Sequence, residues 1–535
     1  MVVLRRPPLF YPEITADEVL KRTSKRIPDK PAFTYPKKVT FTEFDALANR
    51  FAAALADMGV KKGDRVCVYL PNSIEFEVAY YGITRAGGVL TPMNPMFKEM
   101  EVEFQAVDSE AVGIVCLDKL YPTVKKVIEG GKTKLEWVTV VGEKQPGTYS
   151  FIECVEKYPP NPPKQIYDVK EDLAVLPYTA GTTGLQKGVM LTHYNIVSNM
   201  LQTAVALEVH ENDVCLTVLP LYHIYALNVI MGAAVYVGAT QVIMQRFGVK
   251  EFCELVEKYK VTYINMVTPM FLFIADYLEK PQTRKYDWSA LRFVNNGAAP
   301  IPRAIAERFE KVARDRCNSQ VIVTHGWGLT EASPVVAFNP YYKIKIESQG
   351  ILLSDTDHMV IDPETGRELS MGESGEIIVK GPQIMKGYWK KSPDDGFITI
   401  NREKWLRTGD LGYVDEEGYE YLVDRIKEVI KYKGYTVAPF ELEDLLMKHP
   451  AVADVAVIGK PEQVVGEIPK AFIVLNPESK EKVAKEEIID WVGERISAYK
   501  RIREVEFVDK IPRSTAGKLL RRQLKAQELK KISKT

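Results

Sequence analysis

The chain has 535 residues, and at about 100–200 residues per domain this length predicts roughly three structural units. Hydrophobic residues make up 46% and charged residues 27%, which is typical of a globular protein with a large core. The 71 basic side chains balance the 71 acidic ones, so no global charge indicates nucleic acid, and none is expected as a partner.

The first 170 residues alternate between helix and strand patterns. Apolar spacing predicts helices over residues 42–58 and 73–85, and buried strands over residues 65–70 and from residue 88. Such alternation favours βαβ units and a mostly parallel sheet. A proline-rich loop over residues 158–164 precedes a second alternation of the same kind, from Leu173 to about Phe338. We therefore expect the α/β class, with a large N-terminal domain of layered, mostly parallel sheets and helices.

One stretch is long and apolar enough to span a bilayer. No Asp, Glu, Lys or Arg occurs from Val214 to Gln245. The stretch contains Pro220, His223 and Asn228, and it reads better as a buried helix over residues 228–238 and a buried strand over residues 240–244. No transmembrane segment is predicted.

The last third of the chain changes character. Shorter strands and glycine turns after Gly350 favour a small β-rich subdomain. Residues 425–535 hold 23 basic and 17 acidic side chains, a net charge of +6, and their pattern predicts a compact α+β domain, for which the family resemblance given below implies mobility. Helices are expected over 440–448, 486–496 and the tail, with strands over 455–458 and 471–475. We predict an N-terminal domain of 1–424 (subdomains about 1–170, 171–340 and 341–424), a hinge near 424–428, and a C-terminal domain of 425–535.

Cysteines and termini indicate the setting of the protein. The six cysteines form no CxxC pair and no zinc pattern with the six histidines, so reduced core thiols in a cytoplasmic protein are expected. The first eight residues, MVVLRRPP, lack the apolar region of a signal peptide. The basic tail, residues 518–534, reads as a solvated helix, although peripheral contact with an anionic membrane surface stays open.

Two glycine motifs are rejected as nucleotide sites. Residues 130–133 (GGKT) end like a P-loop, but Lys126 occupies the position of the first glycine. Residues 326–331 (GWGLTE) resemble a dinucleotide fingerprint, but Glu331 would repel a pyrophosphate.

A third motif suits a polyphosphate. Residues 179–188 (TAGTTGLQKG) follow an apolar strand over 173–177 and precede a helix for which Thr192 is a plausible N-cap. Glycines let backbone N–H groups face an anion, threonine hydroxyls donate hydrogen bonds, and Lys187 adds positive charge. Taken alone, the loop could also be an ordinary turn.

The loop, extended to residues 178–193, resembles the phosphate loop of the adenylate-forming family. That family includes acyl-CoA synthetases, 4-coumarate ligases, luciferases and adenylation domains of peptide synthetases, and this chain looks closest to fatty-acid and 4-coumarate ligases. Ala180 and Gln186 stand where Ser and Pro are commoner. The resemblance implies that ATP phosphates contact the following loop residues: Thr179, Gly181, Thr182, Thr183, Gly184 and Lys187.

Further family motifs follow in order along the chain. Residues 220–227 resemble the motif that shapes the acyl pocket, with His223 near the substrate carboxylate, and residues 296–300 resemble the stretch along the adenine. Residues 325–331 resemble the central motif, in which Thr330 meets the α-phosphate and Glu331 binds Mg²⁺; His325 replaces a commoner Gln. The implied adenine contacts are Gly297, Ala298, Ala299, Trp327 and Gly328.

The C-terminal motifs complete the resemblance. Asp410 falls where the family holds both ribose hydroxyls, and Arg425 where it holds the ribose or phosphate. Lys427 falls at the family's pivot. Residues 431–435 resemble the loop beside the CoA arm, which implies roles for Lys433, Gly434 and Tyr435, and Lys518 matches the adenylation lysine of the motif over 512–522.

The implied reaction joins a carboxylic acid to CoA in two steps. The acid attacks the α-phosphorus of ATP with Mg²⁺, and then the CoA thiol attacks the acyl-adenylate while the C-terminal domain turns about the hinge. The sequence shows no Ser/His/Asp arrangement that offers a nucleophile. Three alternatives stay open: an adenylating domain that feeds a carrier protein, a luciferase-type oxygenase, and a binding protein without activity. Against the first, no carrier segment is recognised after Lys518.

The identity of the acid is the main open question. The pocket residues implied by the family are mostly apolar, so an alkyl or aryl acid is expected rather than an amino acid. We expect a medium- or long-chain fatty acid, with a 4-coumarate-like aryl acid as the alternative. The oligomeric state is not predicted, although a homodimer is compatible with the sequence. The expected pocket residues are His223, Tyr225, Val229, Gly297, Gly326, Pro334 and Val335.

Overall fold

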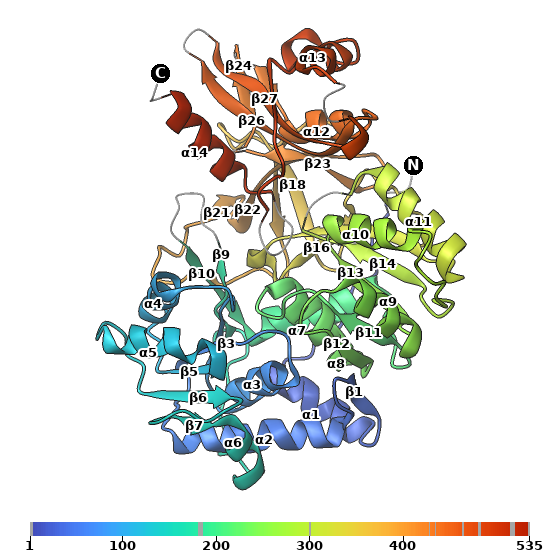
Figure 1. Cartoon of the computed structure of the whole chain (residues 1–535). Helices are drawn as coiled ribbons and strands as arrows, with labels where there is room; N and C mark the ends of the chain where they lie inside the picture. The colour runs from blue at the N-terminus through green and yellow to red at the C-terminus, as the bar shows by residue number, and fades with distance from the viewer. Residues whose placement is uncertain are drawn as a thin grey trace.

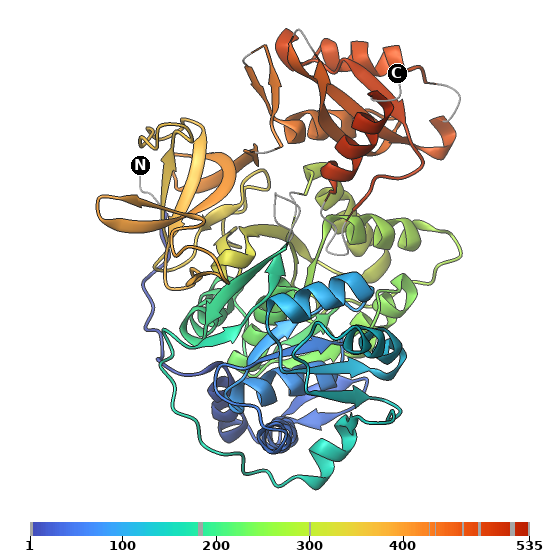
Figure 2. The ribbon, with the colours of Figure 1, turned by 90° about the vertical axis from the view of Figure 1, so that its left-hand side faces the viewer.

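A computed structural model describes residues 4–179, 186–298, 301–426, 428–433, 435–462, 465–479, 483–513 and 519–532. Two large sheets with their helices build the N-terminal part, and a third, smaller sheet builds a separate C-terminal domain above it (Figure 1). A view turned by 90° shows the C-terminal domain joined to the rest through a narrow region (Figure 2). The predicted α/β class and the separate C-terminal domain are confirmed.

The larger sheet combines a parallel centre with an antiparallel extension. Strands β15, β14, β13, β11, β12 and β1 pair in parallel, as predicted, and β16 onward pair antiparallel in the β-rich part. In spatial order its strands are β18 (Asp357–Ile361), β19 (Gly375–Lys380), β22 (Glu403–Val414), β23 (Tyr419–Arg425), β17 (Gly350–Leu352), β16 (Val335–Phe338), β15 (Ile322–Gly328), β14 (Phe293–Asn296), β13 (Tyr263–Met266), β11 (Val214–Thr217), β12 (Thr240–Ile243), β1 (Pro31–Tyr35) and β2 (Val39–Thr40), with β21 (Phe397–Ile400) beside β22.

The second sheet crosses the expected division at residue 170. Leu90 of the first alternation pairs with Val175 of the second, while Phe33 pairs with Gln241 in the other sheet. The two alternations therefore exchange strands. In spatial order the sheet contains β20 (Gly387–Tyr388), β10 (Lys187–Thr192), β8 (Leu173–Val175), β4 (Val89–Pro92), β3 (Arg65–Tyr69), β5 (Gly113–Leu117), β6 (Trp137–Val141) and β7 (Tyr149–Ser150), with β9 (Tyr178–Thr179) beside β10.

The helices of the N-terminal part follow the apolar periodicity. The helix expected over 42–58 is α2, which Thr40 and Glu43 begin with a reciprocal capping box and which buries Phe44, Phe51 and Leu55. The helices are α1 (Ala16–Arg26), α2 (Phe41–Asp57), α3 (Ile74–Arg85), α4 (Glu99–Asp108), α5 (Tyr121–Glu129), α6 (Phe151–Lys157), α7 (His193–Ala206), α8 (Ala233–Val237), α9 (Val249–Lys258), α10 (Thr268–Glu279) and α11 (Arg303–Cys317).

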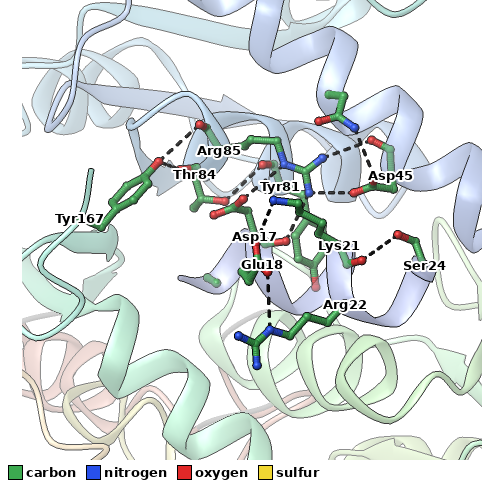
Figure 3. Close-up of polar contacts among 12 residues, drawn as sticks. Asp17, Glu18, Lys21, Arg22, Ser24, Asp45, Tyr81, Thr84, Arg85 and Tyr167 are labelled. Atoms are coloured by element: carbon green, nitrogen blue, oxygen red, sulfur yellow. Dashed lines mark hydrogen bonds and ion pairs between the residues drawn. The ribbon is translucent and has the colours of Figure 1, made fainter. Parts of the chain in front are cut away.

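A buried arginine fastens the first three helices to one another. Arg85 at the end of α3 lies 3.3 Å from Asp17 of α1 and 2.8 Å from Asp45 of α2, with a side chain that is 7% exposed (Figure 3). Tyr167 donates to the Thr84 carbonyl oxygen at 2.6 Å and so covers the same corner. Removing one partner from a buried ion pair leaves an unpaired charge and is strongly destabilising, so this cluster is a structural anchor.

The uncharged stretch is buried, as predicted, but its helix begins as a wide π-helix over Tyr225–Gly232. The Asn228 amide donates to the Ser333 carbonyl oxygen at 2.6 Å and to the Ile196 carbonyl oxygen at 3.2 Å. These tertiary bonds accompany the irregular turns, and such turns are frequent at functional sites. Within the part of the chain that is described, no helix is both long and apolar enough to cross a membrane.

The C-terminal domain packs helices on a small sheet. Its predicted strands are longer than expected, because β26 and β27 form a long hairpin. The tail helix α14 lays Leu524 on Ile458 and Phe472 and pairs Glu528 with buried Lys470 at 2.8 Å, so only its other side is solvated. The elements are β24 (Ile430–Tyr432), β25 (Tyr435–Val437), α12 (Pro439–Met447), β26 (Val452–Glu462), β27 (Gly466–Leu475), α13 (Lys485–Gly493), β28 (Glu504–Phe507) and α14 (Arg521–Ile532).

Candidate active site

Strand pairing places three predicted nucleotide residues together. Asp410 of β22 lies opposite Arg425 of β23, and the Arg425 Nε is 2.8 Å from the Asp410 Oδ1. The Trp327 indole N–H donates to the other carboxylate oxygen at 2.9 Å, and both Trp327 and Asp410 are buried. The Asp410 charge raises the pKa of Arg425 above its ordinary value, against the effect of burial. A carboxylate has further lone pairs that can accept hydroxyl donors, so this arrangement is compatible with a ribose at Asp410.

Glu331 lies at the start of a short turn directly after β15. Thr330 begins this 3₁₀ turn, and the Tyr388 hydroxyl donates to the Glu331 Oε1 at 2.8 Å. Burial, followed by the nearby Glu331 charge, raises the pKa of Tyr388, so the phenol stays a donor. The described residues contain no cluster of three or more metal-ligating side chains.

A hairpin flanks the predicted phosphate loop. Thr179 of β9 pairs with Lys187 of β10, and Thr192 caps α7 by accepting from the Asn195 N–H, as predicted. The Lys187 ammonium lies 3.0 Å from the Asp395 Oδ2 and 4.6 Å from the centre of the Tyr388 ring. The predicted contacts Gly181, Thr182, Thr183 and Gly184 lie outside the described residues.

The predicted acyl motif forms a small cavity at the start of the π-helix. The Tyr225 N–H donates to the His223 Nδ1 at 3.2 Å, which orients the imidazole, and burial raises the pKa of Tyr225. The cavity measures about 10 Å³, and its lining is Leu219, Pro220, His223, Tyr225, Ala226 and Val267. The Tyr225 ring fills the space beside Gly297, where a methyl group would come within 2.5 Å of the Tyr225 Cε1.

The other predicted pocket residues take different positions. A methyl group on Gly326 would lie 2.7 Å from the Ala337 carbonyl oxygen, so this glycine allows the close approach of β15 and β16, and Gly326 also lines the larger cleft described below. Val229 is buried in the π-helix and Pro334 in the turn that precedes β16. Asn199 of α7 holds Val335 through both the N–H and the C=O of its backbone.

A larger cleft of about 560 Å³ lies between the central motifs and the C-terminal domain. Trp327, Gly328 and Asp410 line one side, and α12 and the region around residue 513 line the other. Ala298 lies at the cleft with a left-handed backbone, φ 69°, whereas Ala299 is not among the described residues. His325 also lines the cleft; burial lowers its pKa to about 4, so the imidazole is neutral at pH 7.

The predicted hinge, near residues 424–428, begins at the end of β23. Asp424 accepts from the Phe440 N–H at 3.0 Å at the start of α12, and the Ile426 N–H donates to the Gly409 carbonyl oxygen. Burial raises the pKa of Asp424 to about 6. The Lys433 ammonium lies over the Tyr432 ring at 5.6 Å, and Tyr435 begins β25. The predicted pivot Lys427, the loop glycine Gly434 and the adenylation lysine Lys518 lie outside the described residues.

Comparison with known families decides the assignment. The model of the AMP-binding enzyme family matches residues 20–389, and that of the AMP-binding enzyme C-terminal domain matches residues 441–518. The chain belongs to the AMP-binding enzyme family. The resemblance to adenylate-forming enzymes drawn from the motifs is confirmed.

Similar proteins include CoA ligases of several kinds. A 4-coumarate–CoA ligase of Pinus taeda is 37% identical over 91% of this chain and 89% of its own length. The structure of a long-chain-fatty-acid–CoA ligase (FadD1) from Archaeoglobus fulgidus is also 37% identical, covers 95% of this chain and 99% of its own, and has a TM-score of 0.76. ATP-bound MatB from Rhodopseudomonas palustris, 26% identical, covers 96% and 99% with a TM-score of 0.85. This AMP-binding enzyme is an AMP-forming acid–CoA ligase, as the motifs predicted.

Two site residues escaped the sequence analysis. Tyr388 holds Glu331 across 57 positions, and Asp395 holds Lys187 across 208 positions. No local spacing connects these residues. The only available signal was the Gly387-Tyr388-Trp389 run, which carries two aromatic side chains after a glycine.

Proposed function

We propose that this acid–CoA ligase acts on a carboxylic acid whose body is apolar and carries no charge besides the carboxylate, most directly a medium- or long-chain fatty acid. The observation behind the proposal is the type of side chain in the predicted acyl motif, because the cavity there, about 10 Å³, has room for no more than a water molecule. In the described part of the chain, none of its six lining side chains is Asp, Glu, Lys or Arg. An amino acid substrate would need a carboxylate for its ammonium group, because an unpaired buried charge is strongly disfavoured.

In the first step, the protein holds ATP and orients the acid. Asp410 accepts the ribose hydroxyls, Trp327 covers the adenine together with residues 297–299, and Thr330 donates to the α-phosphate. His223 lies near the acid carboxylate, which attacks the α-phosphorus so that pyrophosphate leaves. Glu331 would hold Mg²⁺ together with phosphate oxygens, and the ion would supply positive charge against the phosphates, while Lys187 and Lys518 place fixed positive charge where negative charge grows.

In the second step, the CoA thiol attacks the acyl-adenylate carbonyl and AMP leaves. We assign the exchange between the steps to rotation of a C-terminal domain, residues 425–535, about a hinge at residues 424–428. Lys518 then departs, and the loop of Lys433, Gly434 and Tyr435 approaches the CoA arm. The bond of Asp424 to the first turn of α12 and the bond of Ile426 to Gly409 support the assignment of this segment as the connection between the two domains.

A 4-coumarate-like aryl acid is the second candidate. It is supported by the 4-coumarate–CoA ligase of Pinus taeda, which is 37% identical over 91% of this chain, whereas the fatty-acid ligase of Archaeoglobus is 37% identical over 95%. It is also supported by the aromatic Tyr225 wall beside Gly297.

A panel of acids separates the candidates. Octanoate, dodecanoate, palmitate, cinnamate, 4-coumarate and phenylalanine are each incubated with ATP, Mg²⁺ and CoA, and pyrophosphate release is recorded. The highest kcat/KM is expected for a fatty acid. A higher value for 4-coumarate would replace the fatty-acid proposal by the aryl alternative, and activity with phenylalanine alone would contradict both.

A further inference from the structure

An arginine just beyond the predicted adenylation lysine is buried among carboxylates. Arg521 begins α14 with a side chain that is 11% exposed. Its Nε and Nη2 contact the two Glu443 carboxylate oxygens at 3.1 and 2.6 Å, a bidentate pair, and its Nη1 contacts Glu428. A bidentate guanidinium–carboxylate pair fixes direction as well as distance.

The two carboxylates belong to different parts of the domain. Glu428 directly follows position 427, where the hinge pivot is expected, whereas Glu443 lies in α12 and also accepts from the Val457 N–H of β26 at 2.8 Å. Arg521 therefore joins the hinge, α12 and β26 at one point. On the other side of position 427, Arg425 pairs with Asp410, so ion pairs bracket the pivot.

The chain is also fixed just before the segment of the lysine. Arg513 pairs with Asp454 of β26 at 2.6 Å, and Arg513 and Leu519 form an antiparallel bridge. The Leu520 N–H donates to the Pro512 carbonyl oxygen at 3.0 Å. The residues directly before and after positions 514–518 are thus hydrogen-bonded to each other, and Arg513 and Arg521 fix them to the rest of the domain.

The residues on both sides of positions 514–518 lie close to the predicted nucleotide residues. Arg513, Leu519 and Arg521 line the same cleft as Trp327 and Asp410. In the sequence, Lys518 precedes Arg521 by three residues. Fixing Arg521 therefore restricts where the lysine can reach.

We propose that Arg521 is a positioning residue for adenylation, which anchors the segment of Lys518 to α12 and to the C-terminal side of the hinge. The inference rests on the proposed role of Lys518. Arg521 itself does not contact the reacting atoms. It holds the base of the segment so that the lysine ammonium stands ready when pyrophosphate leaves, and it makes Glu428 part of the rotating domain.

The test compares Arg521→Gln and Arg521→Lys with Arg522→Gln, a control at the neighbouring exposed position. Pyrophosphate release measures adenylation, and thioester formation from supplied acyl-adenylate measures the second step. Arg521→Gln should lower the kcat of adenylation about tenfold or more with the KM values for ATP and acid within about twofold, because only the transition state loses an interaction. Arg521→Lys should recover part of the rate, and Arg522→Gln should match the wild type.

Thermal melts establish that each variant is folded. If Arg521→Gln does not fold, Glu428→Gln takes its place, since it removes one of the two partners and keeps the Glu443 pair. A folded Arg521 variant that adenylates at the wild-type rate, or that loses both half-reactions by the same factor, would overturn the inference. A wild-type protein that releases no pyrophosphate with any acid would instead overturn the proposed function.

Discussion

Replacing Asp410 by Asn examines the nucleotide site with almost no change of shape. The carboxylate accepts from Trp327 at 2.9 Å and pairs with Arg425 at 2.8 Å, and it is expected to accept the ribose hydroxyls as well. The amide keeps one acceptor oxygen but places an NH₂ group where the other oxygen accepted. One charge-assisted acceptor is therefore lost from the bound state.

The size of the effect follows from the type of bond. A hydrogen bond to a charged group contributes about 1.5–3 kcal/mol. That range corresponds to a dissociation constant for ATP raised about 10- to 150-fold. The fold should survive, because the Arg425 side chain is 38% exposed and can exchange its carboxylate partner for water.

Isothermal titration calorimetry with ATP measures the change directly, and a thermal melt records folding. Trp327→Phe is the matched control, since it removes the indole N–H donor while it keeps an aromatic face and the Asp410 charge. We expect a smaller loss of ATP affinity from this control than from Asp410→Asn. A folded Asp410→Asn protein that binds ATP as tightly as the wild type would refute the assignment of the ribose to Asp410.

Three further changes examine other parts of the account. Tyr388→Phe removes the hydroxyl that donates to Glu331, so adenylation should slow about tenfold and need a higher Mg²⁺ concentration. A titration of pyrophosphate release against Mg²⁺ measures both, and an unchanged Mg²⁺ requirement would contradict the role of Tyr388. Gly297→Ala should displace the Tyr225 ring and change the ratio of kcat/KM between short and long acids at least tenfold, for a clash of about 1–3 kcal/mol, whereas equal rescaling of all acids would place Gly297 outside the pocket. Burial raises the pKa of Glu77 to about 8, so native stability should fall as pH rises from 4.5 to 8. In urea unfolding, Glu77→Gln should leave stability near pH 4.5 unchanged and increase it by on the order of 3–5 kcal/mol above pH 8. A gain in stability that is independent of pH would disprove this.

Local patterns predicted the elements whose stability is local. The capping residue Thr192, helix α2 and strand β3 follow from spacing and propensity within a few residues, and the structure places them within one or two residues of the predicted ends. Asp410 and Arg425, which form an ion pair, could also be predicted from the sequence as candidate nucleotide-binding residues, because each belongs to a motif of its own.

Contacts between segments that are distant in the sequence could not be predicted from local patterns. Arg85 meets Asp17 across 68 positions, and Arg521 meets Glu443 across 78 positions, only because packing brings their elements together. The same reason explains the strands that the two N-terminal sheets exchange. A motif locates Gly326, but the contacts that a side chain there would make depend on the neighbouring strand β16.

The central claim is that this AMP-binding enzyme forms an acyl-adenylate and then a CoA thioester. The most direct measurement is product analysis with α-³²P-labelled ATP, an accepted acid and Mg²⁺, with and without CoA. Without CoA, we predict a single burst of pyrophosphate and enzyme-bound acyl-adenylate; with CoA, we predict steady turnover with AMP, pyrophosphate and thioester in equal amounts. Release of ADP and phosphate, or turnover that does not depend on CoA, would contradict the account.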